Sequence, residues 1–250
     1  MEDQRRSHLY TRRQTLRALG CVSAAIFLGC RRDLAHQASA DIARDAFAAS
    51  IPGCVVRPEQ TEGPYFIDEK LHRSDIRLDP SDKSIKPGVP MRLEFQVSTV
   101  AANSCRPLTG AMVDVWHCDA LGVYSDVHDS MTDSRGKKFL RGYQVTDEKG
   151  SANFLTVYPG WYEGRAVHVH FKIRTNPSTK PGFDFTSQLY FDDSVTDRVH
   201  RMAPYKSKGR RTVTNDRDGV FRRGGKQLIP ELIKDERGYF AKLAIGLRVT

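Results

Sequence analysis

The chain is organised around the stretch YPGWYEGRAVHVHF, which occupies residues 158–171 and ends in a His-x-His pair. Residues two apart on a β-strand point to the same face, so His168 and His170 are predicted to project together. The apolar residues around them then face the core. Two imidazoles on one face suit a first-row transition metal. The structural alternative is one buried histidine beside one exposed histidine.

A turn that carries further candidate side chains precedes this strand. Pro159, Gly160 and Gly164 favour turns, and Tyr162 and Arg165 lie among them. A tyrosine and an arginine held beside a histidine strand indicate a functional site more than a plain hairpin.

The first forty residues are predicted to be an export signal. Residues 11–16, TRRQTL, show a twin-arginine pattern, residues 19–29 form a short apolar core, and residues 38–40, ASA, resemble a cleavage signal. An apolar core this short does not span a bilayer. Such a signal directs export to the periplasm or the cell exterior and leaves residues 41–250 as the mature domain. A disordered basic tail is the alternative, and Cys30 would anchor the chain in a membrane if it were lipidated.

The charge of the chain does not indicate nucleic acid as a partner. The full sequence carries 39 Lys and Arg against 30 Asp and Glu, a net charge of +9, but residues 1–40 hold seven of the Arg and three of the acids. The +5 that remains is modest and favours small anionic molecules over polyanions. Basic residues cluster in residues 198–226, most densely in KSKGRR at 206–211, where no aromatic residue offers a stacking platform. A solvated loop is expected there.

Three cysteines remain after the signal: Cys54, Cys105 and Cys118. In an oxidising compartment, one disulfide and one free thiol are the simplest arrangement. We predict a bridge between Cys54 and Cys105, because it would tie an irregular N-terminal segment to the sheet, and a free Cys118. Three buried free cysteines are the alternative.

The pattern of short strands predicts an all-β fold. Alternating polar and apolar residues and short buried runs indicate strands at residues 91–97, 111–116, 139–145, 152–157, 168–173, 187–191 and 239–249. Short peripheral helices are expected at residues 194–202 and 228–234, and Asp147–Gly150 is a turn sequence. Many short strands with long loops predict a single-domain β-sandwich or a barrel, and the sandwich is favoured.

Two further stretches complete the pattern. Residues 113–125, VDVWHCDALGVYS, run from a buried strand into a polar loop, and residues 58–66, PEQTEGPYF, form a Gly- and Pro-rich loop. Together with residues 158–171, they resemble the intradiol ring-cleavage dioxygenases, the non-haem Fe(III) enzymes that open catechol-type rings. The chain looks closest to the exported group related to the protocatechuate dioxygenase β chain. The similarity covers most of residues 54–250.

The resemblance implies a metal site and a substrate pocket. Fe(III) would be held by two tyrosinates and two histidines, namely Tyr124, Tyr162, His168 and His170. Arg165 and Gln188 would lie beside the substrate, and Tyr162 would be the ligand that dissociates when substrate binds. The loop that walls the pocket would contribute Thr61, Gly63, Pro64 and Tyr65.

The implied reaction inserts both atoms of O₂ into a small aromatic vicinal diol and gives a cis,cis-muconate-type diacid. Charge supports the ligand set, because Fe(III) suits anionic oxygen ligands and a nearby cation is needed to deprotonate a tyrosine, whose ordinary pKa is about 10. A two-His, one-carboxylate Fe(II) site is the main competitor, and it would need an acid such as Glu163 near the histidines. His117, Trp116 and Trp161 are expected to be packing residues.

Two other functions stay open on sequence alone. The chain could be an exported β-sandwich binding module without catalysis, or His168 and His170 could hold Zn or Cu. Tyrosinate bound to Fe(III) is coloured, whereas a binding module or a zinc protein is colourless, so colour separates these functions. The sequence does not set which catechol is bound, whether the chain forms a homo-oligomer, or what residues 198–226 do.

Overall fold

Strands dominate the described part of the chain, which comprises residues 55–101, 104–128, 132–176 and 182–248 of a computed structural model. These residues belong to one compact unit, Pro52–Thr250. The predicted export signal, Cys30 and Cys54 lie outside the described residues. No helix within the described ranges is long and apolar enough to cross a membrane.

The first sheet is built around the long strand β1 (Pro90–Ala101). β2 (Ser104–Pro107) and β5 (Ser151–Val157) pair antiparallel with successive parts of β1. β9 (Gly238–Arg248) pairs parallel with β1, and β8 (Glu231–Asp235) pairs antiparallel with β9.

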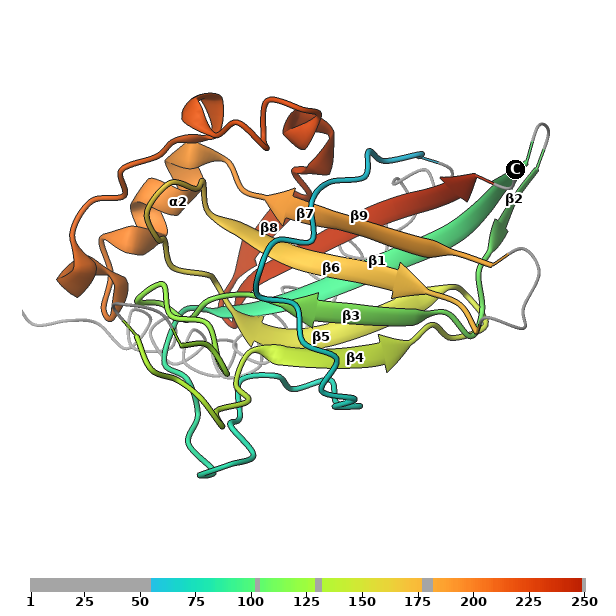
Figure 1. Ribbon diagram of the computed structural model, residues 1–250. Coiled ribbons are helices and arrows are strands. Elements are labelled where there is room, and N and C mark those ends of the chain that lie inside the picture. The colour runs from blue at the N-terminus through green and yellow to red at the C-terminus, as the bar shows by residue number, and fades with distance from the viewer. Residues whose placement is uncertain (1–54, 102–103, 129–131, 177–181, 249–250) are drawn as a thin grey trace, which may run out of the picture. The chain divides into compact units, whose positions relative to one another are not determined.

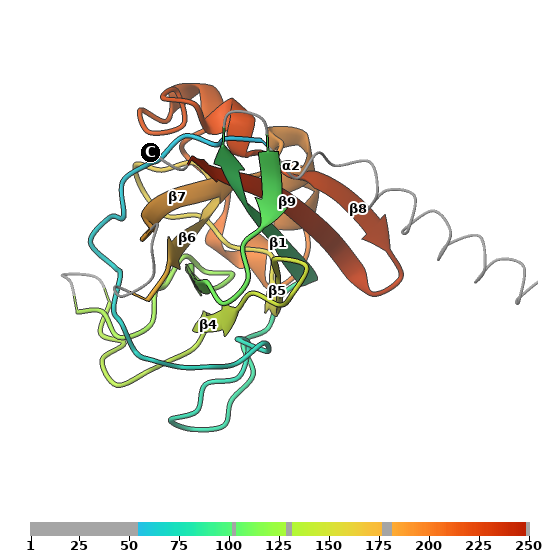
Figure 2. The same cartoon turned by 90° about the vertical axis from the view of Figure 1, so that its right-hand side faces the viewer.

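The second sheet is antiparallel throughout. Its order is β4 (Arg141–Val145), β3 (Met112–Trp116), β6 (His168–Arg174) and β7 (Asp184–Tyr190). Figure 1 shows these strands in front of β1 and β9, and Figure 2 shows the two sheets as separate layers. The all-β sandwich predicted from the sequence is therefore confirmed.

The hydrophobic core lies between the two sheets. Leu93 and Phe95 of β1 are buried in the same cluster as Val169 and Phe171 of β6. The ring centroids of Phe95 and Phe171 are 5.0 Å apart. Burying a side chain of this size contributes about 1.5–3 kcal/mol, so this apolar layer determines which face of β6 turns inward.

The other face of the second sheet is covered by an irregular segment. From residue 58 to residue 73 the backbone crosses the strands in the order β7, β6, β3 and β4, as the cyan ribbon in Figure 1 shows. Gln60 N–H donates to Thr186 O at 2.9 Å at one end, and Arg73 N–H donates to Tyr143 O at 3.2 Å at the other. We call residues 58–73 the crossing segment. It encloses the outer face of β6.

Short helices follow β7. They are α2 (Asp193–His200) and the 3₁₀ turns η1 (Tyr205–Lys208), η2 (Asn215–Arg217) and η3 (Gly225–Leu228). The helix predicted at residues 194–202 corresponds to α2, but the helix predicted at residues 228–234 is wrong, since β8 occupies most of that range. Pro230 lacks the N–H that a continuing helix needs. Leu232 packs against the core from the β8–β9 hairpin.

The predicted strands are all present with shifted ends, while the sequence did not indicate β2 and β8. The turn at Asp147–Gly150 forms as expected, with Gly150 N–H donating to Asp147 O at 2.8 Å. It links β4 to β5, which belong to different sheets, so it connects the layers of the sandwich.

The cysteines follow the predicted arrangement as far as the described residues reach. Cys105 is disulfide-bonded, and Cys118 is a buried free thiol. Because Cys54 lies outside the described residues, its pairing with Cys105 stays a prediction.

Buried His117 should make stability depend on pH. Its ring is fully buried, with Nδ1 2.8 Å from Cys118 O and Nε2 2.7 Å from Thr156 Oγ1, and burial lowers its pKa to about 4. The unfolded state, with a pKa near 6.5, binds the proton first as pH falls, so stability is lost between about pH 6.5 and 4. We expect the stability deficit of His117→Gln relative to wild type, measured by urea denaturation, to shrink by up to about 3 kcal/mol from pH 7 to pH 4. A deficit that is constant with pH would contradict this account.

Candidate metal centre

The centre is built on the outer face of β6. His168 and His170 project from this face, while Val169 between them belongs to the core. In the strand register, Trp116 of β3 and Gln188 of β7 lie directly opposite His170. Cross-strand partners share a face of the sheet. The register therefore gathers two imidazoles, an indole and an amide on the face that the crossing segment covers.

The two histidines present their Nε2 atoms to one point. His168 Nδ1 lies 2.6 Å from Ala166 O, and a carbonyl only accepts, so Nδ1 carries the proton and Nε2 keeps its lone pair. His168 Nε2 lies 3.0 Å from His170 Nε2 and 3.2 Å from Tyr162 Oη. Adjacent ligands at right angles on a metal, with bonds of about 2.1 Å, are about 3 Å apart. These spacings fit one metal ion.

Tyr124 supplies a second phenol to the same place. It follows β3, is 4% exposed, and its ring centroid lies 5.6 Å from that of Tyr162 and 6.2 Å from that of His170. Its hydroxyl is buried and has no hydrogen-bond partner among the described residues. Leaving a buried hydroxyl unsatisfied costs about 1–3 kcal/mol. A metal ion bound to the phenolate would remove that cost.

Burial sets the protonation states of all four side chains. It raises the pKa of the Tyr124 and Tyr162 phenols above their ordinary value, so both stay neutral until a cation is close. Burial, together with the charge of Arg165, lowers the pKa of His168 to about 3 and that of His170 well below its ordinary value. Neutral imidazole is the form that binds metals.

The competing ligand sets would add a carboxylate or a thiolate to the two histidines, and the described residues offer no such third ligand. Within the described residues no group of three or more His, Cys, Asp and Glu side chains could hold a metal ion. Glu163, the nearest acid in sequence, is exposed and accepts a hydrogen bond from Thr212 Oγ1 at 3.1 Å. A metal held at His168 and His170 would therefore take its further protein ligands from the two tyrosines.

Arg165 lies in the turn that precedes the two histidines of β6. Residues 164–167 are irregular, with β6 beginning at His168, so Arg165 is not forced onto the core face. Its Nη2 donates to Gln188 Oε1 at 2.6 Å, and Gln188 Nε2 donates to Thr61 O at 2.8 Å. The structure thus connects Arg165, Gln188 and the crossing segment in one chain of hydrogen bonds.

Asp218 is a site residue that sequence reasoning missed. Its side chain is fully buried; Oδ2 accepts from Arg165 Nε at 2.9 Å and from Ala166 N at 2.8 Å, and Oδ1 accepts from Val220 N at 2.6 Å. Burial alone would raise its pKa, but the Ala166 N–H and the Arg165 charge lower it. Asp218 lies in the segment expected to be a solvated loop, and no local pattern marks it.

The predicted pocket residues lie along the crossing segment. Gly63 packs against His170: a Cβ added there would lie 3.3 Å from the imidazole Cε1. Tyr65 stacks on Tyr124 with centroids 4.5 Å apart. Thr61 contributes its carbonyl to Gln188, and Pro64 is exposed at the tip of the loop.

The three residues expected to be packing residues are all buried, and one of them, Trp116, also contacts a candidate ligand. His117 and Trp161 are buried, and they are hydrogen-bonded to Thr156 and Gly209. Trp116, by contrast, lies flat on the His170 imidazole, with ring centroids 4.9 Å apart and planes inclined by 9°. It therefore fixes the orientation of a candidate ligand as well as filling space.

Two glycines allow the Tyr124 loop and the Tyr162 turn to meet. Gly160 N–H donates to Asp119 O at 3.0 Å, and a Cβ on Gly160 would lie 2.4 Å from Ala120 O. A Cβ on Gly122 would lie 2.0 Å from Trp161 O. Only glycine permits backbones to approach this closely.

Gly160→Ala should therefore loosen the centre. We expect a loss of roughly 1–3 kcal/mol in unfolding free energy, because the added methyl forces the two loops apart, together with weaker retention of metal. Urea denaturation and metal analysis measure the two effects. Gly219→Ala is the matched control, since a Cβ there would meet only Arg222 Nη2 at 3.9 Å. Equal stability and metal content in both variants would contradict the proposed role of the close approach.

Comparison with known proteins gives a consistent result. Residues 61–217 match a family model described as dioxygenase. A chlorocatechol 1,2-dioxygenase from Pseudomonas putida is 33% identical over 165 residues, which is 57% of this chain and 58% of that protein. A protocatechuate 3,4-dioxygenase beta chain from Burkholderia cepacia is 29% identical over 140 residues, 51% of this chain and 56% of that protein. The chain spans about half the length of the curated relatives it matches.

Solved structures extend the similarity. An intradiol ring-cleavage dioxygenase from Tetranychus urticae superposes with a TM-score of 0.66 at 30% identity, covering 79% of this chain and 95% of that chain. A hydroxyquinol 1,2-dioxygenase from Pseudomonas putida DLL-E4, at 21% identity and a TM-score of 0.53, shares the fold.

Proposed function

The chain belongs to the intradiol ring-cleavage dioxygenase family, and we propose on this basis that it binds Fe(III) and cleaves a catechol-type ring with O₂. The observation that carries the proposal is the convergence of two phenols and two neutral imidazoles in one buried place. As phenolates, Tyr124 and Tyr162 would offset two of the three charges of Fe(III), and His168 and His170 would complete the protein ligands. When bound, Fe(III) supplies a chelating site for both catechol oxygens and makes the ring reactive toward O₂.

Tyr162 is the phenol that we assign to proton transfer. It is partly exposed, whereas Tyr124 is buried and stacked against Tyr65. Tyr162 therefore has room to move away from His168 when substrate arrives. Its oxygen would then accept a hydroxyl proton from the substrate.

Arg165 supplies a fixed positive charge. Asp218 and Gln188 hold its guanidinium on two sides, so its position is set before substrate binds. A preorganised cation stabilises the negative charge that develops on the ring. Gln188, which is fully buried, would position Arg165 and line the substrate pocket with the crossing segment.

The proposal extends to substrate, product and location. The substrate is a small aromatic vicinal diol, and the product that incorporates both oxygen atoms is a cis,cis-muconate-type diacid. Residues 1–40 would export the protein, with a lipid anchor at Cys30 and assembly into a homo-oligomer as further options. Oxygen uptake by the iron-loaded protein with a panel of catechols tests the reaction. Uptake with none of them would leave a binding module as the better account.

Variants of two tyrosines distinguish the proposed metal ligand, Tyr124, from the neighbouring ring that stacks on it, Tyr65. Tyr124→Phe removes a proposed phenolate, so we expect loss of the visible absorption that tyrosinate gives with Fe(III) and a lower iron content. Tyr65→Phe keeps the ring that stacks on Tyr124 and should retain both. Absorption spectra and metal analysis measure the difference. If the two variants hold equal iron with equal colour, Tyr124 is not a ligand.

Arg165→Gln should affect the reaction more than the metal. We expect iron and colour to remain, because Arg165 is not among the four proposed ligands, and turnover to fall by roughly 10²–10³. Asp218→Asn should lower turnover less, since the guanidinium remains but loses its charged partner. Oxygen uptake and iron analysis on both variants provide the test. Loss of iron from Arg165→Gln, or turnover at the wild-type rate, would show that this arginine is structural.

A further inference from the structure

A buried hydroxyl group contacts both Arg165 and the glutamine that holds it. Tyr190, the last residue of β7, is fully buried and is the cross-strand partner of His168. Its Oη lies 2.9 Å from Gln188 Oε1 and 3.4 Å from Arg165 Nη2. The same Oη lies 2.8 Å from Gln60 Oε1. The Tyr190 hydroxyl group therefore joins Arg165 to the crossing segment.

The neighbours of the two glutamines determine which amide atom faces Tyr190. Gln60 Nε2 donates to Val220 O at 3.1 Å. A carbonyl oxygen only accepts, so the nitrogen of this amide faces Val220 and its oxygen faces Tyr190. Gln188 is oriented in the same way, because Arg165 donates to its Oε1 and its Nε2 donates to a carbonyl oxygen of the crossing segment. The Tyr190 hydroxyl group thus faces two acceptors.

The Tyr190 hydroxyl group has a single hydrogen, so it can satisfy only one of the two oxygens at a time. Gln188 Oε1 already accepts from Arg165 Nη2 at 2.6 Å, whereas Gln60 Oε1 has no other hydrogen-bond partner among the described residues. The hydrogen therefore points to Gln60 while Arg165 is bonded to Gln188. Gln188 is fully buried and Gln60 is only partly buried. The Gln188 oxygen is thus the costlier of the two to leave without a donor.

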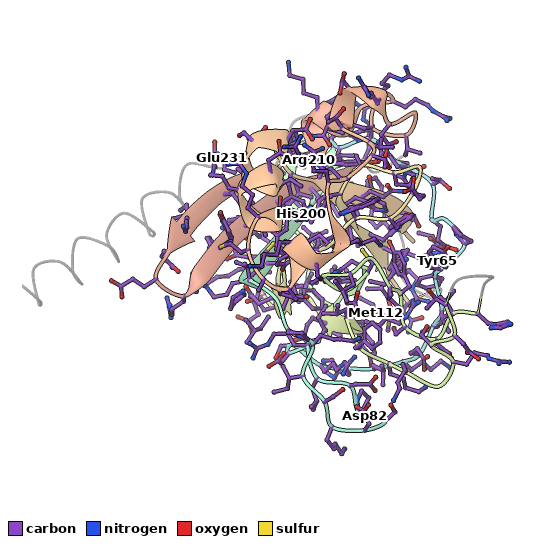
Figure 3. The ribbon with its side chains drawn as sticks, turned by 90° about the vertical axis from the view of Figure 1, so that its left-hand side faces the viewer. Tyr65, Asp82, Met112, His200, Arg210 and Glu231 are labelled. Carbon is purple, nitrogen blue, oxygen red and sulfur yellow. The ribbon has the colours of Figure 1, made fainter. Side chains whose placement is uncertain are left out.

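Both oxygens that this hydrogen can reach belong to segments that are held in place. Gln60 lies on the crossing segment, which Figure 3 shows at the right-hand side, where Tyr65 is labelled. Its side chain is bonded to the backbone of Val220 in the segment after α2, which Arg210 marks in the upper part of Figure 3. Gln188 lies within β7. The hydrogen can therefore change its acceptor by rotation of the hydroxyl group, without movement of either glutamine.

We propose that Tyr190 is a positioning residue, which lets Arg165 turn toward the reacting ring without leaving a buried oxygen unpaired. This inference rests on the proposed function: negative charge that develops on the substrate attracts Arg165 Nη2 and lengthens its bond to Gln188 Oε1. Arg165 Nε stays on Asp218. The Tyr190 hydrogen then turns from Gln60 to Gln188 and replaces the donor that Gln188 has lost. No proton is transferred, because the hydrogen stays on its own oxygen throughout.

A double-mutant cycle of turnover tests the proposal in the iron-loaded protein. Tyr190→Phe keeps the ring and removes the hydroxyl group, so we expect kcat for a catechol to fall about tenfold, because one buried oxygen is unpaired in the transition state. Binding of the same catechol without O₂, followed by visible absorption, should stay within about twofold of wild type, since Arg165 still holds Gln188 before the reaction. Unchanged kcat in Tyr190→Phe overturns the proposal without any arginine variant.

The second side of the cycle replaces Arg165 by methionine, which can neither bond to Gln188 nor stabilise the ring. In this Arg165→Met background, adding Tyr190→Phe should change kcat by less than about twofold. A hydroxyl group that only supports the fold would lower kcat by the same factor with or without Arg165. Equal losses in the two backgrounds therefore overturn the proposal.

Urea denaturation of the same variants gives a test that needs no catalysis. Tyr190→Phe alone leaves Gln188 with Arg165 as its donor, so the urea midpoint should fall only slightly. In Arg165→Met the Tyr190 hydrogen is the remaining donor for the buried Gln188 oxygen, so adding Tyr190→Phe should lower the midpoint further than it does in wild type. An equal or smaller shift in that background overturns the proposal. If wild-type protein takes up no O₂ with any catechol, the proposed function fails, and this measurement still decides whether the hydrogen changes its acceptor.

Tyr158→Phe is the matched control for both measurements. Tyr158 is also fully buried, and its hydroxyl group lies 2.8 Å from Thr196 Oγ1. Within the described residues no hydrogen bond joins it to Arg165 or Gln188. We expect Tyr158→Phe to shift the urea midpoint equally in wild type and in Arg165→Met. A shift that depends on the background as strongly as that of Tyr190→Phe would show a general effect of Arg165 on the fold, and the specific role of Tyr190 would be refuted.

Discussion

One buried guanidinium, that of Arg141, holds together the two loops that shape the metal centre. Arg141 starts β4 and is 2% exposed. Its Nη1 donates to Tyr65 O at 2.6 Å, while Nε and Nη2 donate to Ser125 O at 3.2 and 2.7 Å. Tyr65 lies on the crossing segment and Ser125 follows Tyr124, so one planar group sets the spacing between a candidate ligand and the ring stacked on it. A lysine, with a single ammonium, has no such fork of donors.

The same arginine gives the centre a charge that its own hydrogen bonds do not balance. Those bonds, within the described residues, go to carbonyl and hydroxyl oxygens of Tyr65 and Ser125 and not to a carboxylate. A buried charge without a counter-charge is costly. Arg165 differs, because Asp218 neutralises it directly. Glu69 and Asp126 act on Arg141 through space, and a phenolate at Tyr124 would act on it more strongly, so the buried cation and the proposed tyrosinate ligand favour each other.

Much of this arrangement was predictable because it is encoded locally. The His-x-His alternation of β6, with Val169 directed to the core, follows from a two-residue period that any strand must obey. The turn that carries Tyr162 is specified by Pro159 and Gly160 within the same fourteen-residue stretch. The wrong prediction of a helix at residues 228–234 has the opposite cause. The local sequence is compatible with a helix, but pairing with β9 makes most of this range a strand.

The parts that sequence reasoning missed are contacts between distant residues. Asp218 meets Arg165 across 53 positions and Arg141 meets Tyr65 across 76, so neither contact leaves a periodic signal. Composition is misleading for the same reason. Residues 198–226 looked like one solvated basic loop, yet folding sorts their charges into two places. Asp218 turns inward to fix Arg165, while Arg201 and Arg210 gather around a separate cavity. Net charge is a sum over a segment, whereas the role of each charge depends on the partner that the fold gives it.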